Sequence, residues 1–365
     1  MRENKTKIGM SKSTPPISIR RRNSSIELYR IIATFAVIIV HFNGWFVGSL
    51  PESFDVHHLS SFRIGQTIIE AATCICVNMF LIISGYFGLR LKWESVIKIC
   101  LLLLFIYIPF YLFTAVYKSE FEIRTLIRNF FVITKSGYFI QCYLMLIFLS
   151  PALNSFIDKY ERKLLLKWTI VFLSIEFWFG GIMKVEALGF NKGYSVIHFV
   201  LMYMIARCLF LYKTELTRLR WWTWGLGYLI CTVVISLMYI AGVKYCWDYS
   251  NPVVVASSIC SFIPFIYYNY ENKIINWIAK STLAVYIIQC TDPVYSFIVK
   301  LDNSMLEANP YFIYLLESLL VIVVLFFLCI LYDKLCGIAI KPLSKCILQY
   351  INSKSEKIIV NEHKQ

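Results

Sequence analysis

The sequence predicts an all-α integral membrane protein, a bundle of about ten transmembrane helices with both termini in the cytoplasm. Of the 365 residues, 58% are apolar and only 16% are charged, and the mean hydropathy is +0.64. A soluble domain of this length has too little interior to bury so many apolar side chains, whereas a bilayer solvates them. The same composition excludes disordered, collagen-like and disulfide-rich secreted chains.

Ten apolar stretches have lengths that suit membrane spans. The first, residues 26–48, follows the basic residues Arg20–Arg22 and lacks a small-residue cleavage site, which is typical of a signal anchor rather than a removable signal peptide. The others fall near residues 64–87, 97–117, 138–157, 165–182, 194–212, 221–242, 252–269, 276–299 and 311–333. We therefore expect a flexible basic tail over 1–22, a transmembrane domain over 23–340 and a cytoplasmic tail over 341–365.

The net charge of +14 is a topology signal. With the N-terminus in the cytoplasm, nine of the 36 lysines and arginines fall on the outer side and 27 on the inner side, as the positive-inside rule requires. The aromatic residues lie in apolar runs and not among clustered basic residues, so we expect no nucleic-acid binding. The 12 cysteines lack C-x-x-C spacing and are expected to be small buried apolar residues.

A short set of ionisable residues lies inside the predicted spans. Each costs at least ~2.5 kcal/mol to insert, so each is a functional candidate by default. The set comprises Glu27, Arg30, His41, Glu70, Glu176, His198, Arg207 and Glu317.

Arg30 and His41 share one face of the first predicted helix. Their spacing of eleven residues is roughly three turns plus 20°, which places them about 16 Å apart along the axis, and Glu27 lies within about 40° of the same stripe. A guanidinium suits a phosphate group, and an imidazole suits a general base acting on a hydroxyl. The alternative is that Glu27 and Arg30 are interfacial anchors and His41 is a hydrogen-bonded packing residue.

Three further features are open to two interpretations each. Ser84–Gly85, near the inner end of the second span, suits either a functional site or close helix packing. Glu70 could face a sugar hydroxyl or bond a neighbouring helix. His57–His58, beside Asp55, is expected to be a solvated loop with at most adventitious metal binding, and no metal site is predicted.

At this point the chain resembles a known family. Arg30, ten intervening residues and His41, preceded by Ser25–Tyr29, resemble the opening helix of the acyltransferase family 3 membrane proteins, bacterial enzymes that acylate surface polysaccharides and related glycans. Phe80–Tyr86, with its Ser-Gly step, is similar to the end of a later span in that family. The resemblance covers residues 23–335, and it implies ten spans and an acyltransferase domain.

Later segments are similar too, with two departures. Tyr138–Tyr143 and Leu149–Asn154 resemble an aromatic-to-Pro-x-Leu-Asn segment of the polysaccharide-modifying members, and Ser281–Gln289 resembles a late helix. That helix often ends in histidine, where this chain has Gln289. The basic residues after the Ser-Gly step are also more loosely spaced than in the family; they are Arg90, Lys92 and Lys98.

The resemblance implies transfer of an acyl group, expected to be acetyl, from cytoplasmic acyl-CoA to a hydroxyl of a cell-surface or lipid-linked polysaccharide in the bacterial plasma membrane. His41 is expected to act as general base or acyl carrier, with Arg30 and Glu27 beside it in the catalytic set. The expected donor- and substrate-binding residues are Ser84, Arg90, Lys92, Lys98, Glu70 and Gln289. No permanently bound cofactor and no oligomeric state is predicted.

One alternative function belongs to a different class. In a transporter or flippase of polysaccharide intermediates, His41, Glu70 and Glu317 would line a proton or substrate path. Dependence on acyl-CoA separates the two, because a transporter would release no free CoA.

Overall fold

The computed structural model describes residues 22–46, 50, 60–131 and 137–362, and within these residues the regular structure is entirely helical. The first half contains α1 Ser24–His41, the π-helix η1 Phe42–Phe46, α2 Ser61–Thr73, α3 Cys76–Phe87, α4 Trp93–Lys118, α5 Ile123–Phe130, α7 Tyr138–Lys159, α8 Arg162–Glu176 and the π-helix η3 Phe177–Ile182. The second half contains η4 Glu186–Leu188, η5 Asn191–Gly193, α9 Val196–Leu211, α10 Lys213–Leu216, α11 Trp221–Ile240, α12 Pro252–Ile266, α13 Lys273–Ala279, α14 Thr282–Gln289, α15 Asp292–Ala308 and α16 Tyr311–Glu362.

Within the described residues, seven helices are long and apolar enough to cross a membrane, or eight when one bent pair is taken as a span. The seven are Ser24–Gly44, Ser61–Phe87, Trp93–Lys118, Tyr138–Lys159, Arg162–Ile182, Trp221–Ile240 and Tyr311–Ser353. The remaining expected spans, near 194–212, 252–269 and 276–299, correspond to the shorter apolar helices α9 and α12 and to the pair around α14 and α15, which is bent by 79°. The membrane helical bundle is confirmed at this level.

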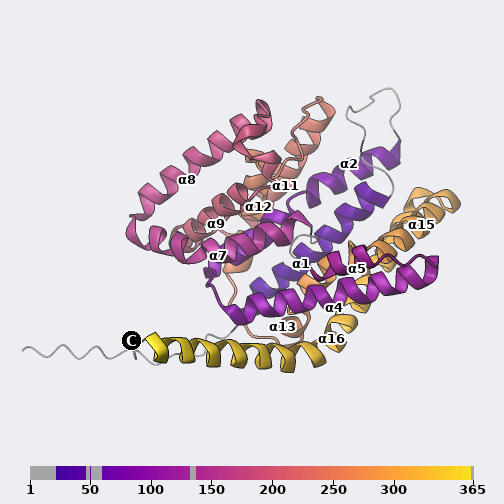
Figure 1. Cartoon of the computed structure of the whole chain (residues 1–365). Coiled ribbons are helices and arrows are strands. Elements are labelled where there is room, and N and C mark those ends of the chain that lie inside the picture. Colours follow the sequence, from indigo (N-terminus) through magenta and orange to yellow (C-terminus); the bar gives the residue numbers. More distant parts are fainter. Residues whose placement is uncertain (1–21, 47–49, 51–59, 132–136, 363–365) are drawn as a thin grey trace, which may run out of the picture.

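Helix α1 runs through the middle of the bundle, with α13 near its start and α2 near its end (Figure 1). Its start is fixed by Asn23, whose side chain accepts a hydrogen bond from the Ser25 backbone N–H at 3.0 Å. The Ser25 hydroxyl donates to the Phe265 carbonyl at 2.8 Å, and the Ser24 hydroxyl lies 3.0 Å from the Asn276 side-chain oxygen. These bonds tie the first turn of α1 to the ends of α12 and α13.

Three spans are interrupted near the end of α1. Helix α1 passes into the π-helix η1 directly after His41, α2 and α3 are separated at Cys74–Ile75, and α14 ends at Gln289 before the bend into α15. Irregular backbone at membrane depth is tolerated where protein or a polar cavity surrounds it, and π-turns are frequent at functional sites. The interruptions therefore point to a site at this end of α1.

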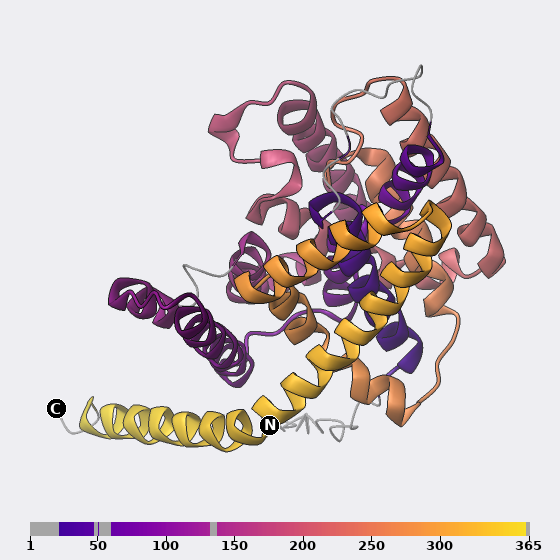
Figure 2. The same ribbon diagram turned by 90° about the vertical axis from the view of Figure 1, so that its right-hand side faces the viewer.

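Two features set how the helices pack. Gly85 faces α9 so closely that a Cβ there would lie 2.6 Å from the Ala206 Cβ and 2.9 Å from the Tyr203 carbonyl oxygen, so the Ser-Gly step does provide close helix packing. Helix α16 continues well beyond residue 333 to Glu362, and Figure 2 shows its C-terminal part extending past the other helices. Most of the expected cytoplasmic tail, 341–365, is therefore helical.

Candidate functional site

A cavity of about 270 Å³ opens around the end of α1. His41 and Glu70 are its ionisable lining residues, and Cys74, Cys76 and Val77 of the α2–α3 interruption form part of its wall. Aromatic side chains from four other segments complete it; they are Tyr138, Tyr194, Trp247, Tyr249 and Tyr286. One imidazole and one carboxyl group thus face a small, largely aromatic chamber, which we call the His41 cavity.

His41 is only 7% exposed, and the side chain of Gln289, which is 1% exposed, lies beside its imidazole ring. Gln289 is the last residue of α14, so the 79° bend into α15 turns the chain away directly after it. A neutral amide can either donate to an imidazole nitrogen or accept from an imidazole N–H. Gln289 can therefore orient the ring of His41, but it cannot exchange protons near neutral pH as a histidine would.

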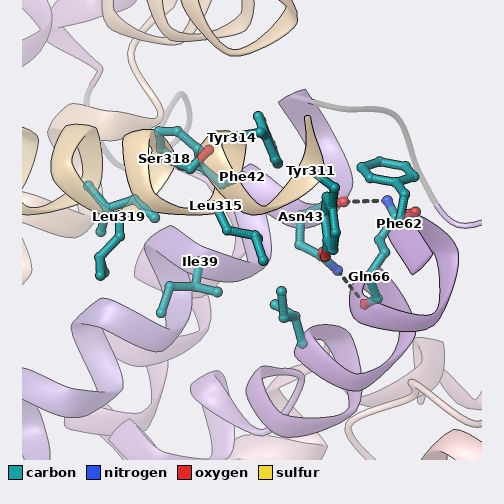
Figure 3. A pocket seen from close by; sticks show the side chains of 12 residues that line it. Ile39, Phe42, Asn43, Phe62, Gln66, Tyr311, Tyr314, Leu315, Ser318 and Leu319 are labelled. Atoms are coloured by element: carbon teal, nitrogen blue, oxygen red, sulfur yellow. Dashed lines mark hydrogen bonds between the residues drawn. The ribbon is translucent and has the colours of Figure 1, made fainter. Parts of the chain in front are cut away.

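Glu70 is held by Asn43, a residue of η1. The Asn43 side-chain amide donates to a Glu70 carboxylate oxygen at 2.7 Å and to the Gln66 carbonyl at 3.0 Å, and the Gln66 amide donates back to the Asn43 carbonyl at 2.7 Å. Asn43 and Gln66 also line a second cavity of about 270 Å³, which is mostly apolar and is bordered by Tyr311. Figure 3 shows the pair in this cavity. The hydrogen bond from Asn43 thus holds the carboxyl group of Glu70 in the wall of the His41 cavity.

A separate cavity of about 250 Å³ surrounds Arg30 near the start of α1. Arg22 and Lys280 line it together with Arg30, and Ser84 and Tyr143 line the facing wall, with 3.3 Å between their hydroxyl oxygens. We call this chamber the Arg30 cavity. Three cationic groups around one small space suit a phosphate-bearing ligand.

Glu27 is nearly buried and pairs with Arg30 at 2.8 Å, and its other carboxylate oxygen lies 3.9 Å from Arg22. This carboxylate orients the two guanidinium groups that line the Arg30 cavity. Glu27 and Arg30 lie one turn apart at the start of α1, and Arg22 lies just before the helix begins. Glu27 itself does not reach the His41 cavity.

The expected donor-binding residues divide into two groups. Ser84 lines the Arg30 cavity, whereas Arg90, Lys92 and Lys98 do not. Arg90 and Lys92 are exposed between α3 and α4, and the Lys98 ammonium pairs with Glu94 one turn earlier on α4. Lys280 was not among the expected site residues, because it lies 250 residues from Arg30 in the sequence and no local pattern joins the two.

The two cavities meet at Tyr286, which lines both. Its ring packs against Phe139 with centroids 5.0 Å apart, and Phe139 in turn packs against Phe80 at 6.0 Å and Tyr143 at 5.9 Å. Phe80, Phe139 and Tyr143 all line the Arg30 cavity. Aromatic side chains from α3, α7 and α14 therefore form the partition between the two cavities.

A buried polar network supports the wall of the His41 cavity. The Asn78 amide donates to the Tyr249 carbonyl at 3.0 Å, which turns the Asn78 oxygen toward His198, so the His198 Nε2–H donates to it at 2.8 Å. His198 Nδ1 lies 3.1 Å from a carboxyl oxygen of Glu176, and Glu176, His198 and Asn78 are all fully buried. One proton is therefore shared between Glu176 and His198 Nδ1.

The network joins Glu176 and His198, which the sequence analysis treated as separate candidates. Glu176 and His198 were each unusual as ionisable residues within predicted spans, and this rarity was the available signal, but nothing in their spacing paired them. Glu176 ends α8 immediately before the π-helix η3, much as His41 ends α1 before η1. Tyr249, whose carbonyl the network holds, lines the His41 cavity, so these residues act on the cavity wall from behind.

The other candidates lie elsewhere. Glu317 accepts a hydrogen bond from Asn309 at 2.8 Å, and Arg207 donates to the Tyr86 carbonyl at 3.2 Å; neither lines the two cavities. Asp55 and His57–His58 fall outside the described residues. Among the residues that the structure describes, no group of three or more His, Cys, Asp or Glu side chains could hold a metal ion.

One titratable group lies in the loop beside the His41 cavity. Asp248 stands between the lining residues Trp247 and Tyr249, and burial raises the pKa of its carboxyl group to about 6, against the opposing effect of Lys192 and Lys184. The loop is held by the Tyr249 N–H, which donates to the Lys192 carbonyl at 3.1 Å. The loop beside the cavity therefore carries a carboxyl group whose pKa is raised by burial.

The arrangement brings an imidazole into one chamber and three cationic side chains into an adjoining one. Comparison of the chain with curated proteins found no match. Comparison with solved structures also found none. A family model described as an acyltransferase domain matches residues 23–334, and this range includes every helix that lines the two cavities. The chain therefore belongs to acyltransferase family 3 and is a multi-pass membrane acyltransferase.

Proposed function

We propose that this protein transfers an acyl group, with acetyl as the expected group, from acyl-CoA to a hydroxyl of a cell-surface or lipid-linked polysaccharide. The observation that carries the proposal is the placement of Arg30 and His41. One buried helix presents the cation to one cavity and the imidazole to the next, and the two cavities share Tyr286. A substrate with an anionic end and a reactive thioester end, joined by a long arm, fits two chambers arranged in this way.

The Arg30 cavity is the proposed site for the CoA phosphates. Arg22, Arg30 and Lys280 offer several N–H donors, and Glu27 holds the two guanidinium groups toward the cavity. The axial separation of Arg30 and His41, about 16 Å from the helical rise, must then be covered by the arm that carries the thioester. Passage of this arm past Tyr286 brings the acyl carbon to His41.

At His41 the reaction replaces a carbon–sulfur bond with a carbon–oxygen bond. As general base, the imidazole takes the proton of the acceptor hydroxyl while its oxygen attacks the acyl carbon, and CoA leaves as a thiolate that receives the proton. As acyl carrier, an imidazole nitrogen attacks first, releases CoA and then passes the acyl group to the hydroxyl. Glu70, fixed by Asn43, is placed to accept a hydrogen bond from the acceptor in either route.

The orientation that we propose puts both termini in the cytoplasm of a bacterial cell, with ten spans in the plasma membrane. The support is the excess of lysine and arginine in alternate loops. In this orientation the Arg30 cavity opens toward the cytoplasmic pool of acyl-CoA. The His41 cavity then lies on the side from which a surface glycan approaches.

The test is transfer of radiolabelled acetyl from acetyl-CoA in membranes that contain the native chain or a variant at matched levels. We expect His41→Ala to reduce label in glycan by at least about 1000-fold, because an essential proton acceptor or acyl carrier is lost. The matched control is Glu317→Gln, which changes an intramembrane carboxyl group outside both cavities and should transfer at the native rate.

Two outcomes would reject the proposal. One is transfer by His41→Ala at the native rate, and the other is the absence of transfer by the native chain with several acyl donors and glycan acceptors. Label retained on the native chain without acceptor, and absent from His41→Ala, would assign the acyl-carrier route. Transfer without such labelling assigns the general-base route.

A further inference from the structure

A larger polar cavity lies beyond the His41 cavity and belongs to neither chamber described above. It has a volume of about 600 Å³ and is enclosed by the second half of α4, by α5 and by the beginning of α15. Figure 1 shows α5 beside α4, and the two helices are in contact, as are α4 and α15. We call it the α4–α15 cavity. It has more than twice the volume of the His41 cavity, enough for more than one sugar ring.

Asn129 gives the α4–α15 cavity an unsatisfied polar group. This residue of α5 lines the cavity and is only 1% exposed, and among the residues that the structure describes neither the nitrogen nor the oxygen of its amide has a hydrogen-bond partner. Buried amides are almost always paired, so such a group indicates a missing ligand. A hydroxyl group both donates and accepts, and a sugar with neighbouring hydroxyls could satisfy both atoms of the amide at once.

The charged side chains that line the α4–α15 cavity disfavour an anionic ligand. Among the described residues that line it, Glu120, Glu122 and Asp292 carry carboxyl groups and Lys118 carries an ammonium; the Arg128 guanidinium bonds the hydroxyl of the lining residue Thr125 at 3.1 Å. An anionic sugar or a CoA phosphate placed here would meet like charges, which reduces its affinity relative to that of a neutral ligand. The charge of the residues that line this cavity is therefore opposite in sign to that of the residues around the Arg30 cavity. The cavity suits neutral and amino sugars and disfavours uronic or other acidic sugars.

Aromatic rings supply the remaining wall. Tyr107, Tyr111 and Tyr295 line the cavity, and their flat, amphipathic rings suit the apolar faces of sugar rings while the polar groups take the hydroxyls. Polar side chains and aromatic rings thus share one concave surface, which suits a ligand with many hydroxyl groups.

The α4–α15 cavity adjoins the His41 cavity through two short stretches of chain. Cys290, Thr291 and Asp292 line it and directly follow Gln289, whose side chain lies beside His41. Gly137 lines it as well, and the next residue, Tyr138, lines the His41 cavity. The bend between α14 and α15 therefore lies between the α4–α15 cavity and His41.

We propose that the α4–α15 cavity binds the acceptor, a neutral or amino-sugar glycan, with Asn129 as its central hydrogen-bonding residue and Asp292 as a residue that selects against acidic sugars. The assignment rests on the proposed acyl transfer to a glycan and adds the acceptor site and the charge class of the acceptor. It leaves the Arg30 cavity to the donor, so the two substrates reach His41 from different cavities.

The test is equilibrium binding of radiolabelled tetrasaccharides to the purified full-length chain in detergent, without acyl-CoA. The probes are tetraoses of glucose, N-acetylglucosamine and glucosamine, with tetragalacturonate as the acidic comparison. We expect at least one neutral or amino tetraose to bind, Asn129→Ala to weaken that binding at least tenfold, and Asp292→Asn to raise the affinity for tetragalacturonate relative to the neutral probes. Asn303→Ala, which changes an exposed asparagine of α15 outside the cavity, is the matched control.

Three results would overturn the assignment: no tetraose binds, Asn129→Ala binds as the native chain does, or tetragalacturonate binds most tightly. Because the measurement needs no catalysis, it is independent of the proposed function. A chain that binds a neutral tetraose through Asn129 but transfers no acetyl would keep the binding site and reject the acyl transfer. If the native chain transfers acetyl and Asn129→Ala does so with an unchanged acceptor KM, the acyl transfer is kept and the binding site is rejected.

Discussion

Gln289 stands at the point where the chain differs from the family's late helix, and the structure shows what the difference affects. Its side chain lies beside the His41 imidazole, and its backbone ends α14 at the 79° bend. A histidine at this position could share proton transfer with His41, whereas an amide can only orient the ring. We infer that His41 alone carries the proton or the acyl group in this chain, with Gln289 as its positioning residue.

Truncating Gln289 tests this inference. We expect Gln289→Ala to lower kcat about tenfold, because a poorer orientation of the His41 ring that costs about 1.4 kcal/mol in the transition state slows the reaction by that factor, with the KM for acetyl-CoA unchanged. Gln289→His should retain at least the native kcat, since imidazole can also donate to or accept from His41. The measurement is the steady-state rate of acetyl transfer by both variants. A native kcat in Gln289→Ala would exclude a positioning role.

At the same scale, the sequence predicted some of the site and could not predict the rest. Arg30 and His41 lie eleven residues apart in one helix, so the helical period alone placed them on one face. Gln289 was expected in the site only through the resemblance of its helix to the family, and Lys280 and Tyr286, which line the cavities, were not expected because only the tertiary fold brings them there. Helical periodicity reports neighbours three or four residues apart, and says nothing of contacts between distant helices.

At the scale of helices, apolar length predicted where the membrane helices lie but not where they break. Residues 64–87 and 276–299 were each expected as one span, and the structure divides them at Cys74–Ile75 and after Gln289. No glycine or proline marks the first break, so the local sequence gave no signal for it. Both breaks lie at the His41 cavity, since Cys74 and Cys76 line it and Gln289 lies beside His41.

The contact between α8 and α9 provides a prediction at this scale. His198→Ala leaves the buried Glu176 carboxyl and the Asn78 oxygen without partners, which should cost about 3 kcal/mol and lower Tm by roughly 5–10 °C. Glu176→Gln keeps the shape and one hydrogen bond to His198 Nδ1 and should lower Tm by no more than about 3 °C. Thermal unfolding of the purified variants in detergent measures both. An equal decrease in Tm in the two variants would show that the hydrogen bond between residues 176 and 198 does not contribute to stability.

The same variants report on function because the network ends at Tyr249. Asn78 connects His198 to the Tyr249 carbonyl, so release of Asn78 frees a wall residue of the His41 cavity. We expect His198→Ala to reduce acetyl transfer at temperatures where it remains folded, with the KM for the acceptor raised more than that for acetyl-CoA. An unchanged ratio of the two KM values would confine the network to stability.

At the scale of the whole molecule, the structure separates two chemical environments that suit the two substrates of the proposed reaction. The Arg30 cavity is cationic, the α4–α15 cavity carries three carboxyl groups, and the His41 cavity lies between them with an aromatic wall. Water that reached the thioester would compete with the acceptor hydroxyl, so a transferase gains from keeping its reacting chamber closed until both substrates are present. Tyr286 and Phe139 form the barrier on the donor side.

Removing that barrier should uncouple the reaction. Tyr286→Ala deletes the ring that both cavities share, so we expect the thioester arm to be exposed to water, with CoA released several-fold faster than acetyl appears in glycan. Tyr286→Phe keeps the ring and should stay near one CoA per acetyl. Tyr194→Ala is the matched control, since it enlarges the His41 cavity without opening it toward Arg30. The measurement is the ratio of CoA released to label in glycan, and a ratio near one in Tyr286→Ala would show that other residues keep water from the thioester.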